Sequence, residues 1–287
     1  MSNNFFVFFV FYNRETIMKY VEAVHELSMR IGKTLAESLG VKSANMGIEK
    51  WPCQFRINKY HFTPESVGSP GVQIHTDSGF LTILQDDEGV GGLEVMNKSG
   101  EFIPVEPWPD TLLVNLGDTA KVWSNGRFCN VKHRVQCKEA KIRVSIASFL
   151  LFPSETVLEP PLELVDDDHP RRYVPFMYQD YRKLRLSTKL EAGEALALLH
   201  TPISHKFKLK SVVHVASFTN QYRFKGSYMG IYIIYGENNR FSGVEAVEEP
   251  AAATLFSGNM FTFSSSATSQ MYCIDVMRST LFPSERR

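Results

Sequence analysis

The stretch between residues 55 and 153 constrains the fold more than any other part of the sequence. It consists of short runs rich in β-branched and aromatic residues, separated by turn signals that contain glycine, asparagine or aspartate, for example FRINKYHF, VQIHTD, FLTILQ and TLLVNLG. No crossover helix separates these runs, which argues against a doubly wound parallel sheet. Many short strands at this spacing instead predict an antiparallel sandwich or barrel.

Helical patterns flank this β-rich block. Apolar residues recur every three to four positions over residues 14–39, which predicts an amphipathic helix that ends at Gly40. A Pro- and Asp-rich connection after the block, in which His169 is given a surface role, leads into a second helical run that is broken near Gly193. The predicted fold class is therefore mainly β with flanking helices. We expect four segments: an N-terminal segment and helix at 1–50, the core at 51–153, a connection and C-terminal helix at 154–200, and a tail without clear periodicity at 201–287.

Charge and cysteine usage bear on the partners and the compartment. Lysine plus arginine equals aspartate plus glutamate at 31 each, so there is no electrostatic reason to propose a nucleic acid or a membrane surface as partner. The apolar run at 5–12 is too short to span a bilayer and lacks the features of a secretory signal. The four cysteines include no CxxC pair, which favours free thiols in a reducing compartment. We expect a cytoplasmic protein, and the sequence does not indicate its oligomeric state.

A histidine and an aspartate stand two residues apart in the run VQIHTD. In a strand, His75 and Asp77 would project from the same face. His133 follows far enough along the chain to return on a neighbouring strand. Two imidazoles and one carboxylate are the facial ligand set of non-haem Fe(II) oxygenases, with three positions left for an organic cosubstrate and O2. Each residue alone is more often an ordinary polar residue of a sheet, and only their conjunction favours a metal; His61 is left out because it should point to the opposite face from Tyr60.

A second group of residues suits a carboxylate ligand. Arg143 and Ser145 share a strand face, and together they offer a fork of N–H donors and one O–H donor. Asn58 and Tyr60 share a face of an earlier strand and could add hydrogen bonds to the same ligand. We interpret the NLGD motif at 115–118 as a strand end and a tight turn with a structural role only.

The pattern HxD, then H, then RxS, with an upstream Asn-x-Tyr, resembles the plant soluble 2-oxoglutarate- and Fe(II)-dependent dioxygenases. The likeness is closest to their auxin-oxidising (DAO) group and covers about residues 13–200. It is carried by WPCQFRINKYHFTPESVG, GVQIHTDSGFLTILQDDEGVGGLEVM, LLVNLGDTAKVWSNGRFCNVKHRVQC and AKIRVSIASFLLFP. The resemblance implies a double-stranded β-helix (jelly-roll) core. It also implies that Fe(II) is held by His75, Asp77 and His133, and that 2-oxoglutarate is held by Arg143 and Ser145, with Tyr60 and Asn58.

The same resemblance implies a reaction. The enzyme would use O2 and 2-oxoglutarate as cosubstrates to oxidise a small organic acid, indole-3-acetic acid, with ascorbate as reductant. No catalytic side chains are expected beyond the metal centre. Four residues are candidates for the apolar lining of the substrate site, although each fits an ordinary core position as well: Phe80, Leu84, Trp123 and Phe149.

Both ends of the sequence depart from the family pattern. Family members usually begin with a further N-terminal region, whereas this chain opens with the unfamiliar MSNNFFVFFVFY, and the segment after about residue 201 differs from the short helical ending of the family. Two alternatives therefore stay open. The first is a catalytically impaired jelly-roll protein that binds small acids, and the second is the same chemistry on another plant metabolite, such as a flavonoid, a gibberellin or an alkaloid.

Overall fold

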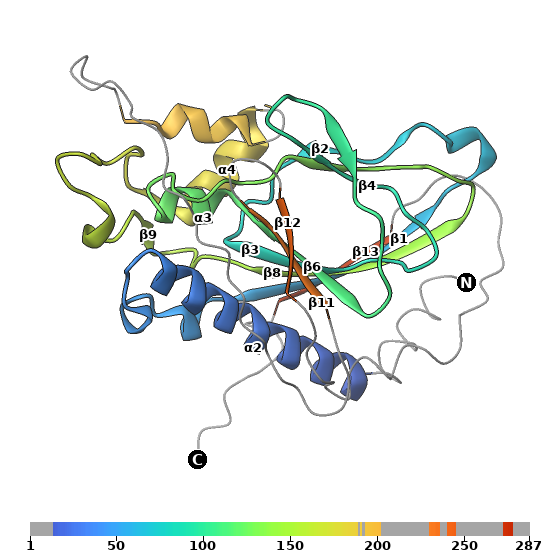
Figure 1. Ribbon diagram of the computed structural model, residues 1–287, viewed down its shortest axis with the longest axis horizontal. Coiled ribbons are helices and arrows are strands. Elements are labelled where there is room, and N and C mark those ends of the chain that lie inside the picture. Colours follow the sequence, from blue (N-terminus) through green and yellow to red (C-terminus); the bar gives the residue numbers. More distant parts are fainter. Residues whose placement is uncertain are drawn as a thin grey trace.

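The computed structural model describes residues 14–188, 190 and 193–201, together with the backbone of three strands at 230–235, 240–244 and 272–277. The N-terminal apolar run and most of the tail lie outside these described residues. Two sheets lie one above the other, with a long helix below the larger sheet and shorter helices at one end (Figure 1). The fold is mainly β with flanking helices, and its jelly-roll core confirms the predicted fold class.

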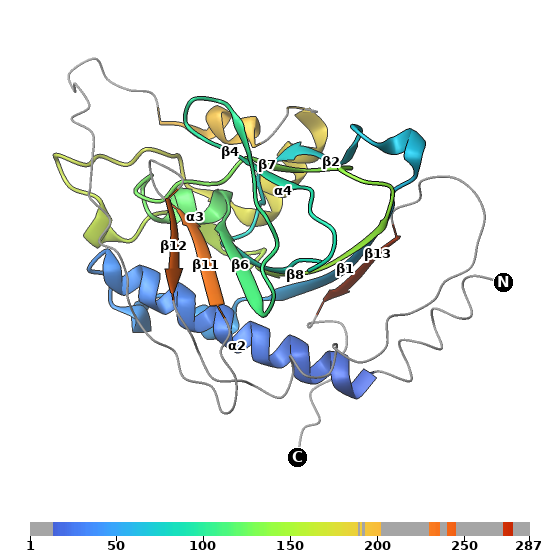
Figure 2. The same cartoon turned by 45° about the vertical axis from the view of Figure 1, so that its right-hand side comes forward.

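The larger sheet has the strand order β12-β11-β6-β3-β8-β1-β13. Its central strands are β1 (Cys53–His61), β3 (Leu81–Gln85), β6 (Thr111–Leu116) and β8 (Ile142–Leu150), and its outer strands are β11 (Gly230–Tyr235), β12 (Arg240–Val244) and β13 (Tyr272–Met277). The four central strands pair antiparallel, β11 runs parallel to β6, and β13 runs antiparallel to β1. Figure 2 shows the strands of this sheet side by side above the long helix.

The smaller sheet has the antiparallel order β2-β7-β4-β5. Its strands are β2 (Pro70–His75), β4 (Leu93–Met96), β5 (Phe102–Pro104) and β7 (His133–Gln136). The connections contain the helices α3 (Asp118–Trp123) and α4 (Tyr178–Thr188), the short strands β9 (Val157–Leu158) and β10 (Phe176–Met177), and the 3₁₀ helices η1 (Ser43–Asn45), η2 (Ile48–Lys50), η3 (Pro64–Ser66), η4 (Leu162–Leu164) and η5 (Glu194–Leu199). Figure 1 shows α3 and α4 close together at one end of the sheets.

Helix α2 (Arg14–Ser38) covers the outer face of the larger sheet (Figure 2). Its buried side chains belong to the same core as the outward-facing residues of the sheet, including Phe55, Ile83 and Ile146. The helix ends as predicted at Gly40, which has a φ of 78° and whose N–H donates to the carbonyl of Glu37, while the Val41 N–H donates to the carbonyl of Ala36. This is the Schellman arrangement, in which glycine adopts the left-handed conformation at no steric cost.

The opposite face of the larger sheet carries the polar side chains. Residues that are paired across antiparallel strands share a face, and side chains alternate along each strand. The register pairs Asn58 with Ser145 and Tyr60 with Arg143, so these four side chains lie on one face. This inner face looks toward the smaller sheet.

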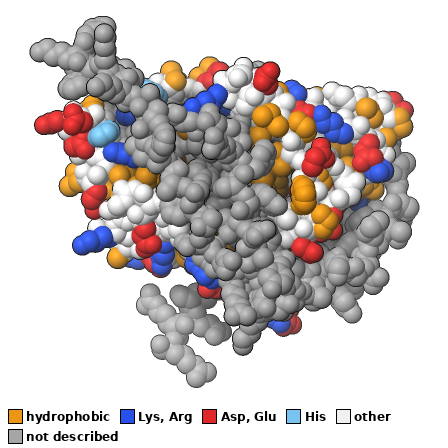
Figure 3. All heavy atoms as spheres, viewed as in Figure 1, with side chains coloured by type: hydrophobic (Ala, Val, Ile, Leu, Met, Phe, Trp, Pro, Cys, Tyr) orange, Lys and Arg blue, Asp and Glu red, His pale blue; other side chains and the backbone are white. Residues whose placement is uncertain are grey.

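The outside of the molecule is mixed in character. Figure 3 shows basic and acidic side chains interspersed with apolar ones over the coloured part of this face. Such mixing agrees with the equal numbers of basic and acidic residues in the sequence. In the part of the chain that the structure describes, no helix has both the length and the apolar character needed to cross a membrane.

Candidate metal centre

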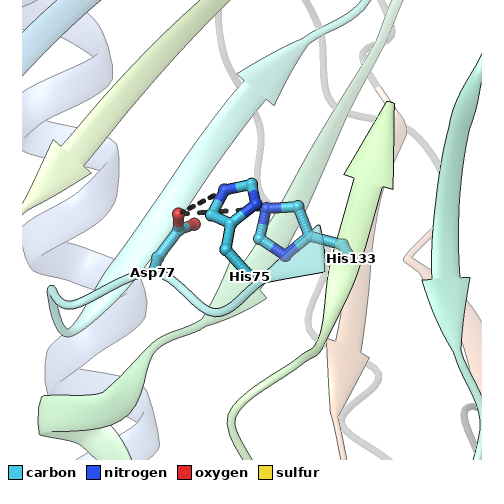
Figure 4. Close-up of side chains that lie close together, drawn as sticks. All are labelled: His75, Asp77 and His133. Atoms are coloured by element: carbon cyan, nitrogen blue, oxygen red, sulfur yellow. Dashed lines mark ion pairs between the residues drawn. The ribbon is translucent and has the colours of Figure 1, made fainter. Parts of the chain in front are cut away.

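His75, Asp77 and His133 converge between the two sheets. His75 ends β2 and His133 begins β7, and the two residues are direct partners in the register of these strands. The Nε2 atoms of His75 and His133 lie 3.7 Å and 3.8 Å from Oδ1 of Asp77, and the three side chains point toward one another in Figure 4. One donor atom from each residue lies within 4.8 Å of the other two. Three donors of this kind, at this separation, fit one transition-metal ion between them.

Backbone carbonyls fix the tautomers of the two histidines. Nδ1 of His75 lies 2.8 Å from the carbonyl of Gln73, and Nδ1 of His133 lies 3.0 Å from the carbonyl of Val131. A carbonyl can only accept, so each Nδ1 carries a proton, and Nε2 is the ring atom that faces Asp77 in both residues. Burial, together with the neighbouring His133, lowers the pKa of His75, which favours the neutral ring. Both histidines therefore direct Nε2, the nitrogen that can bind a metal ion, toward Asp77.

The two oxygens of Asp77 have different surroundings. Oδ2 accepts a hydrogen bond of 2.6 Å from Thr82 Oγ1 and one of 2.9 Å from Asn115 Nδ2. Oδ1 faces the two histidines. Burial alone would raise the pKa of this carboxyl, but the two histidines and the two hydrogen bonds lower it to about 2. The side chain is thus a carboxylate at neutral pH, with one oxygen held by the protein and the other directed to the position of a metal.

Asp77 does not lie on the strand that carries His75. The sequence pattern placed both residues on one strand face, whereas β2 ends at His75 and Asp77 belongs to the connection to β3. The reason lies in the backbone hydrogen bonds that this connection makes with the start of α3. The Asp77 carbonyl accepts from the N–H of Asp118 at 2.8 Å, and the Gly79 carbonyl accepts from the N–H of Thr119 at 3.2 Å. The start of α3 therefore shapes the connection that carries the carboxylate.

Replacing Gly117 by alanine is expected to lower the free energy of unfolding by about 1–3 kcal/mol, the usual cost of overpacking. A Cβ atom at this position would collide with the backbone carbonyl of Gly79 and lie 2.7 Å from that of Asp77. Neither carbonyl can move without displacing the connection. Denaturant unfolding of the variant measures the effect, and Gly89→Ala is the matched control because its Cβ would meet nothing closer than 3.5 Å. Equal stability of the two variants would contradict this packing.

The predicted carboxylate anchor forms a second cluster on the inner face of the larger sheet. Arg143 is fully buried, its guanidinium lies 4.9 Å above the ring of Tyr60, and Asn58 Nδ2 donates to Ser145 Oγ at 3.4 Å. Nη2 of Arg143 pairs with Asp86, a residue that the sequence reasoning did not single out. Within the described residues, Nε and Nη1 of Arg143 have no hydrogen-bond partner. A buried cation with two open donors, beside a hydroxyl and an amide, is suited to one more carboxylate.

The two clusters share one face of the larger sheet. Thr82 and Asn115, which bind Asp77, are register partners on β3 and β6, and Thr82 is also paired with Phe149 on β8. Phe149 lies six residues from Arg143 along the same strand, so the two side chains project from the same face. The connection that carries Asp77 and the side chain of Arg143 therefore both face the space between the two sheets.

Sequence reasoning missed the partners of the ligands. Asn115 is a polar residue within the apolar run TLLVNLG, which was the available signal, but the NLGD motif was interpreted as structural only. That interpretation is incomplete, because Asn115 holds Asp77 Oδ2 and Asp118 holds the Asp77 carbonyl. Nothing in the spacing of Thr82 indicated its contact with Asp77.

The four candidates for an apolar lining separate into two groups. Phe80 and Trp123 are buried in the main core, where Phe80 packs edge-to-face against both Trp51 and Trp123. Their position is that of ordinary core residues. Leu84 packs with the small cluster around Tyr60, and Phe149 lies under the guanidinium of Arg56. Only these last two lie on the inner face with the polar clusters.

Comparisons with known proteins agree with this geometry. Residues 51–151 match the family model of the 2OG-Fe(II) oxygenase superfamily. The chain is 58% identical over 187 residues to a 2-oxoglutarate-dependent dioxygenase DAO from Oryza sativa subsp. indica, a match that covers 65% of this chain and 62% of that protein. The chain thus spans less than two thirds of the length of this relative.

Two solved structures are similar as well. The crystal structure of the rice dioxygenase for auxin oxidation (DAO) superposes with a TM-score of 0.61 at 56% identity, over 66% of this chain and 64% of that one. The complex of the Arabidopsis thaliana dioxygenase for auxin oxidation 1 with 2-oxoglutarate gives a TM-score of 0.53 at 62% identity, over 55% and 59%. Residues 51–151 therefore match the 2OG-Fe(II) oxygenase superfamily, and the chain is similar to plant DAO proteins.

Proposed function

We propose that this chain is a 2-oxoglutarate- and Fe(II)-dependent dioxygenase that oxidises the auxin indole-3-acetic acid. The observation that carries the proposal is the convergence of two imidazole Nε2 atoms and one carboxylate oxygen from His75, His133 and Asp77. This donor set suits Fe(II) and leaves half of an octahedral coordination sphere open. When bound, the iron would supply the redox chemistry that couples decarboxylation of 2-oxoglutarate to oxidation of the substrate.

The residues of the chain bind and orient the reactants. Arg143 and Ser145, with Tyr60 and Asn58, hold the distal carboxylate of 2-oxoglutarate, because Arg143 offers two open donors at a buried position beside the other three side chains. Burial raises the pKa of Tyr60, so its phenol keeps its proton and can donate a hydrogen bond. Thr82 and Asn115 keep Asp77 Oδ2 occupied, which leaves Oδ1 for the metal. The partly apolar inner face limits access of water to the site.

The choice of substrate rests on the relatives. Solved structures of the rice and Arabidopsis thaliana proteins are described as dioxygenases for auxin oxidation, and they are 56% and 62% identical to this chain over 66% and 55% of its length. The aromatic ring of indole-3-acetic acid suits the apolar side chains of Leu84 and Phe149 on the inner face. Ascorbate is proposed as the reductant that keeps the iron ferrous.

Incubation of the purified chain with Fe(II), 2-oxoglutarate, ascorbate and O2 tests the proposal. With indole-3-acetic acid present, we expect succinate and a product heavier by one oxygen atom in stoichiometric amounts, measured by mass spectrometry. A panel containing a flavonoid, a gibberellin and an alkaloid serves as the comparison. Oxidation of a panel member in place of indole-3-acetic acid would overturn the substrate, and binding of 2-oxoglutarate without any turnover would favour the impaired binding protein.

A further inference from the structure

The residue between the two first ligands is held by the C-terminal helix. Thr76 is fully buried, and Arg185 of α4 donates from Nη2 to its carbonyl at 2.7 Å and from Nη1 to its Oγ1 at 3.2 Å. These two residues are 109 positions apart in the sequence. The guanidinium thus binds the backbone of the HxD motif at the single residue that separates His75 from Asp77.

A buried carboxylate orients this arginine. Asp118 is fully buried and pairs with Nη1 of Arg185, and its Oδ2 also accepts a hydrogen bond of 2.6 Å from Tyr181. Its Oδ1 accepts a hydrogen bond of 2.6 Å from Asn130. The backbone N–H of the same Asp118 donates to the carbonyl of Asp77 at 2.8 Å. Asp118 therefore binds the backbone of Asp77 directly and binds Thr76 through Arg185.

The segment after α4 closes against the same residue. Gly193 has a φ of 79°, and a Cβ atom there would collide with Thr76 Oγ1 and lie 3.1 Å from Asp118 Oδ1. No side chain fits between position 193 and Thr76, which is a reason for glycine at this position. The C-terminal segment thus contacts Thr76 at two points, Arg185 and Gly193.

We infer that Arg185 is a positioning residue of the metal centre, which holds the backbone between His75 and Asp77 in its ligating conformation before a metal binds. The metal half of this inference rests on the proposed function, whereas the effect on the loop does not. The two ligands lie at a strand end and in a connection, where regular strand pairing does not fix their relative position. Hydrogen bonds from the half-buried guanidinium of Arg185 to this backbone replace the missing strand pairing.

A purely structural role is the competing explanation. The ion pair between Arg185 and the buried Asp118 would also attach α4 to the core, and removal of the arginine leaves the buried carboxylate without compensation. Two variants separate the roles. Arg185→Met removes the guanidinium alone and leaves the Asp118 carboxylate unpaired. The double variant Asp118→Asn with Arg185→Met removes both charges. Neither variant can form the hydrogen bonds from Arg185 to Thr76. Arg182→Met is the matched control, because Arg182 lies exposed on the same helix.

Amide hydrogen exchange of the metal-free protein tests the effect on the loop. In both variants that lack Arg185, we expect exchange in peptides covering 72–82 and 117–123 to be at least about tenfold faster than in the unaltered chain, because the connection opens more often. Exchange in α2 should change little in the double variant, and Arg182→Met should behave like the unaltered chain. Unchanged protection of residues 72–82 in the double variant would overturn the inference, whatever the protein does with iron.

Binding of Co(II), followed by its visible absorption, tests the consequence for the metal. We expect the affinity to fall about 10–100-fold in both variants that lack Arg185, the range found when groups that orient metal ligands are lost. Arg185→Lys should recover part of it, because a lysine can still reach one acceptor. Full affinity in the stable double variant would overturn the positioning role. Failure of the unaltered chain to bind Co(II) would instead contradict the proposed function, while the exchange experiment still decides the role of Arg185 in the loop.

Discussion

Replacing Asp77 by asparagine is expected to lower 2-oxoglutarate turnover at least about 100-fold. Loss of a residue that only orients a metal ligand already lowers metal affinity or activity about 10–100-fold, and Asp77 is a ligand itself. Thr82 and Asn115 both donate to one oxygen of the present carboxylate. An asparagine must turn its only amide oxygen toward these donors, so its NH2 group takes the place of Oδ1. That nitrogen has no lone pair to offer a metal. The substitution therefore keeps the shape and the hydrogen bonds of the residue but removes its ligand atom.

Succinate production and bound metal per chain measure this effect together. His169→Ala is the control, because His169 is exposed and pairs with Asp166 at the surface. Thermal unfolding of Asp77→Asn should stay close to that of the metal-free unaltered chain, which separates ligand loss from misfolding. Turnover near the unaltered level in Asp77→Asn would contradict the iron assignment.

Replacing Arg143 by methionine is expected to raise the KM for 2-oxoglutarate more than about 100-fold while leaving the affinity for Co(II) unchanged. Two charge-assisted hydrogen bonds at about 1.5–3 kcal/mol each amount to at least about a hundredfold in binding. Nε and Nη1 of Arg143 are buried donors that have no hydrogen-bond partner in the described part of the chain. A metal-binding test separates this effect from damage to the three ligands.

The same substitution would leave Asp86 buried without its partner. Burial already raises the pKa of this carboxyl, and Arg143 counteracts that rise. The double variant Asp86→Asn with Arg143→Met removes both charges and should regain stability without regaining affinity for 2-oxoglutarate. Arg182→Met, which removes an arginine at an exposed position of α4, is the control. Normal KM in the Arg143 double variant would exclude this residue as the anchor.

The sequence predicted those features that follow from periodicity. Helix α2 and its end at Gly40 follow from a 3.6-residue pattern and a glycine, and the strands follow from alternation and turn residues. The pairing of Asn58 with Ser145 and of Tyr60 with Arg143 agrees with the predicted sharing of a face. The helix, its end and the shared face within each strand depend on neighbours in the chain, and a single sequence contains them.

The remaining features depend on contacts between distant segments. The end of β2 at His75 is set by hydrogen bonds from α3 to the following connection, and no local pattern reports them. Asp86 and Arg185 are of residue types that usually lie at the protein surface. Only the folded chain brings Asp86 to Arg143 and Arg185 to Thr76. The assignments of the segment boundaries and of the individual site roles stay predictions.

A crystal structure of the chain with Mn(II) in place of Fe(II), and with 2-oxoglutarate, tests the central claim most directly. Anomalous scattering should give one peak about 2.0–2.2 Å from His75 Nε2, Asp77 Oδ1 and His133 Nε2, by analogy with other first-row metal sites. The distal carboxylate of 2-oxoglutarate should lie within hydrogen-bonding distance of Nε or Nη1 of Arg143. An anomalous peak at another site, or an ion near His75, Asp77 and His133 that these side chains do not contact, would contradict the account.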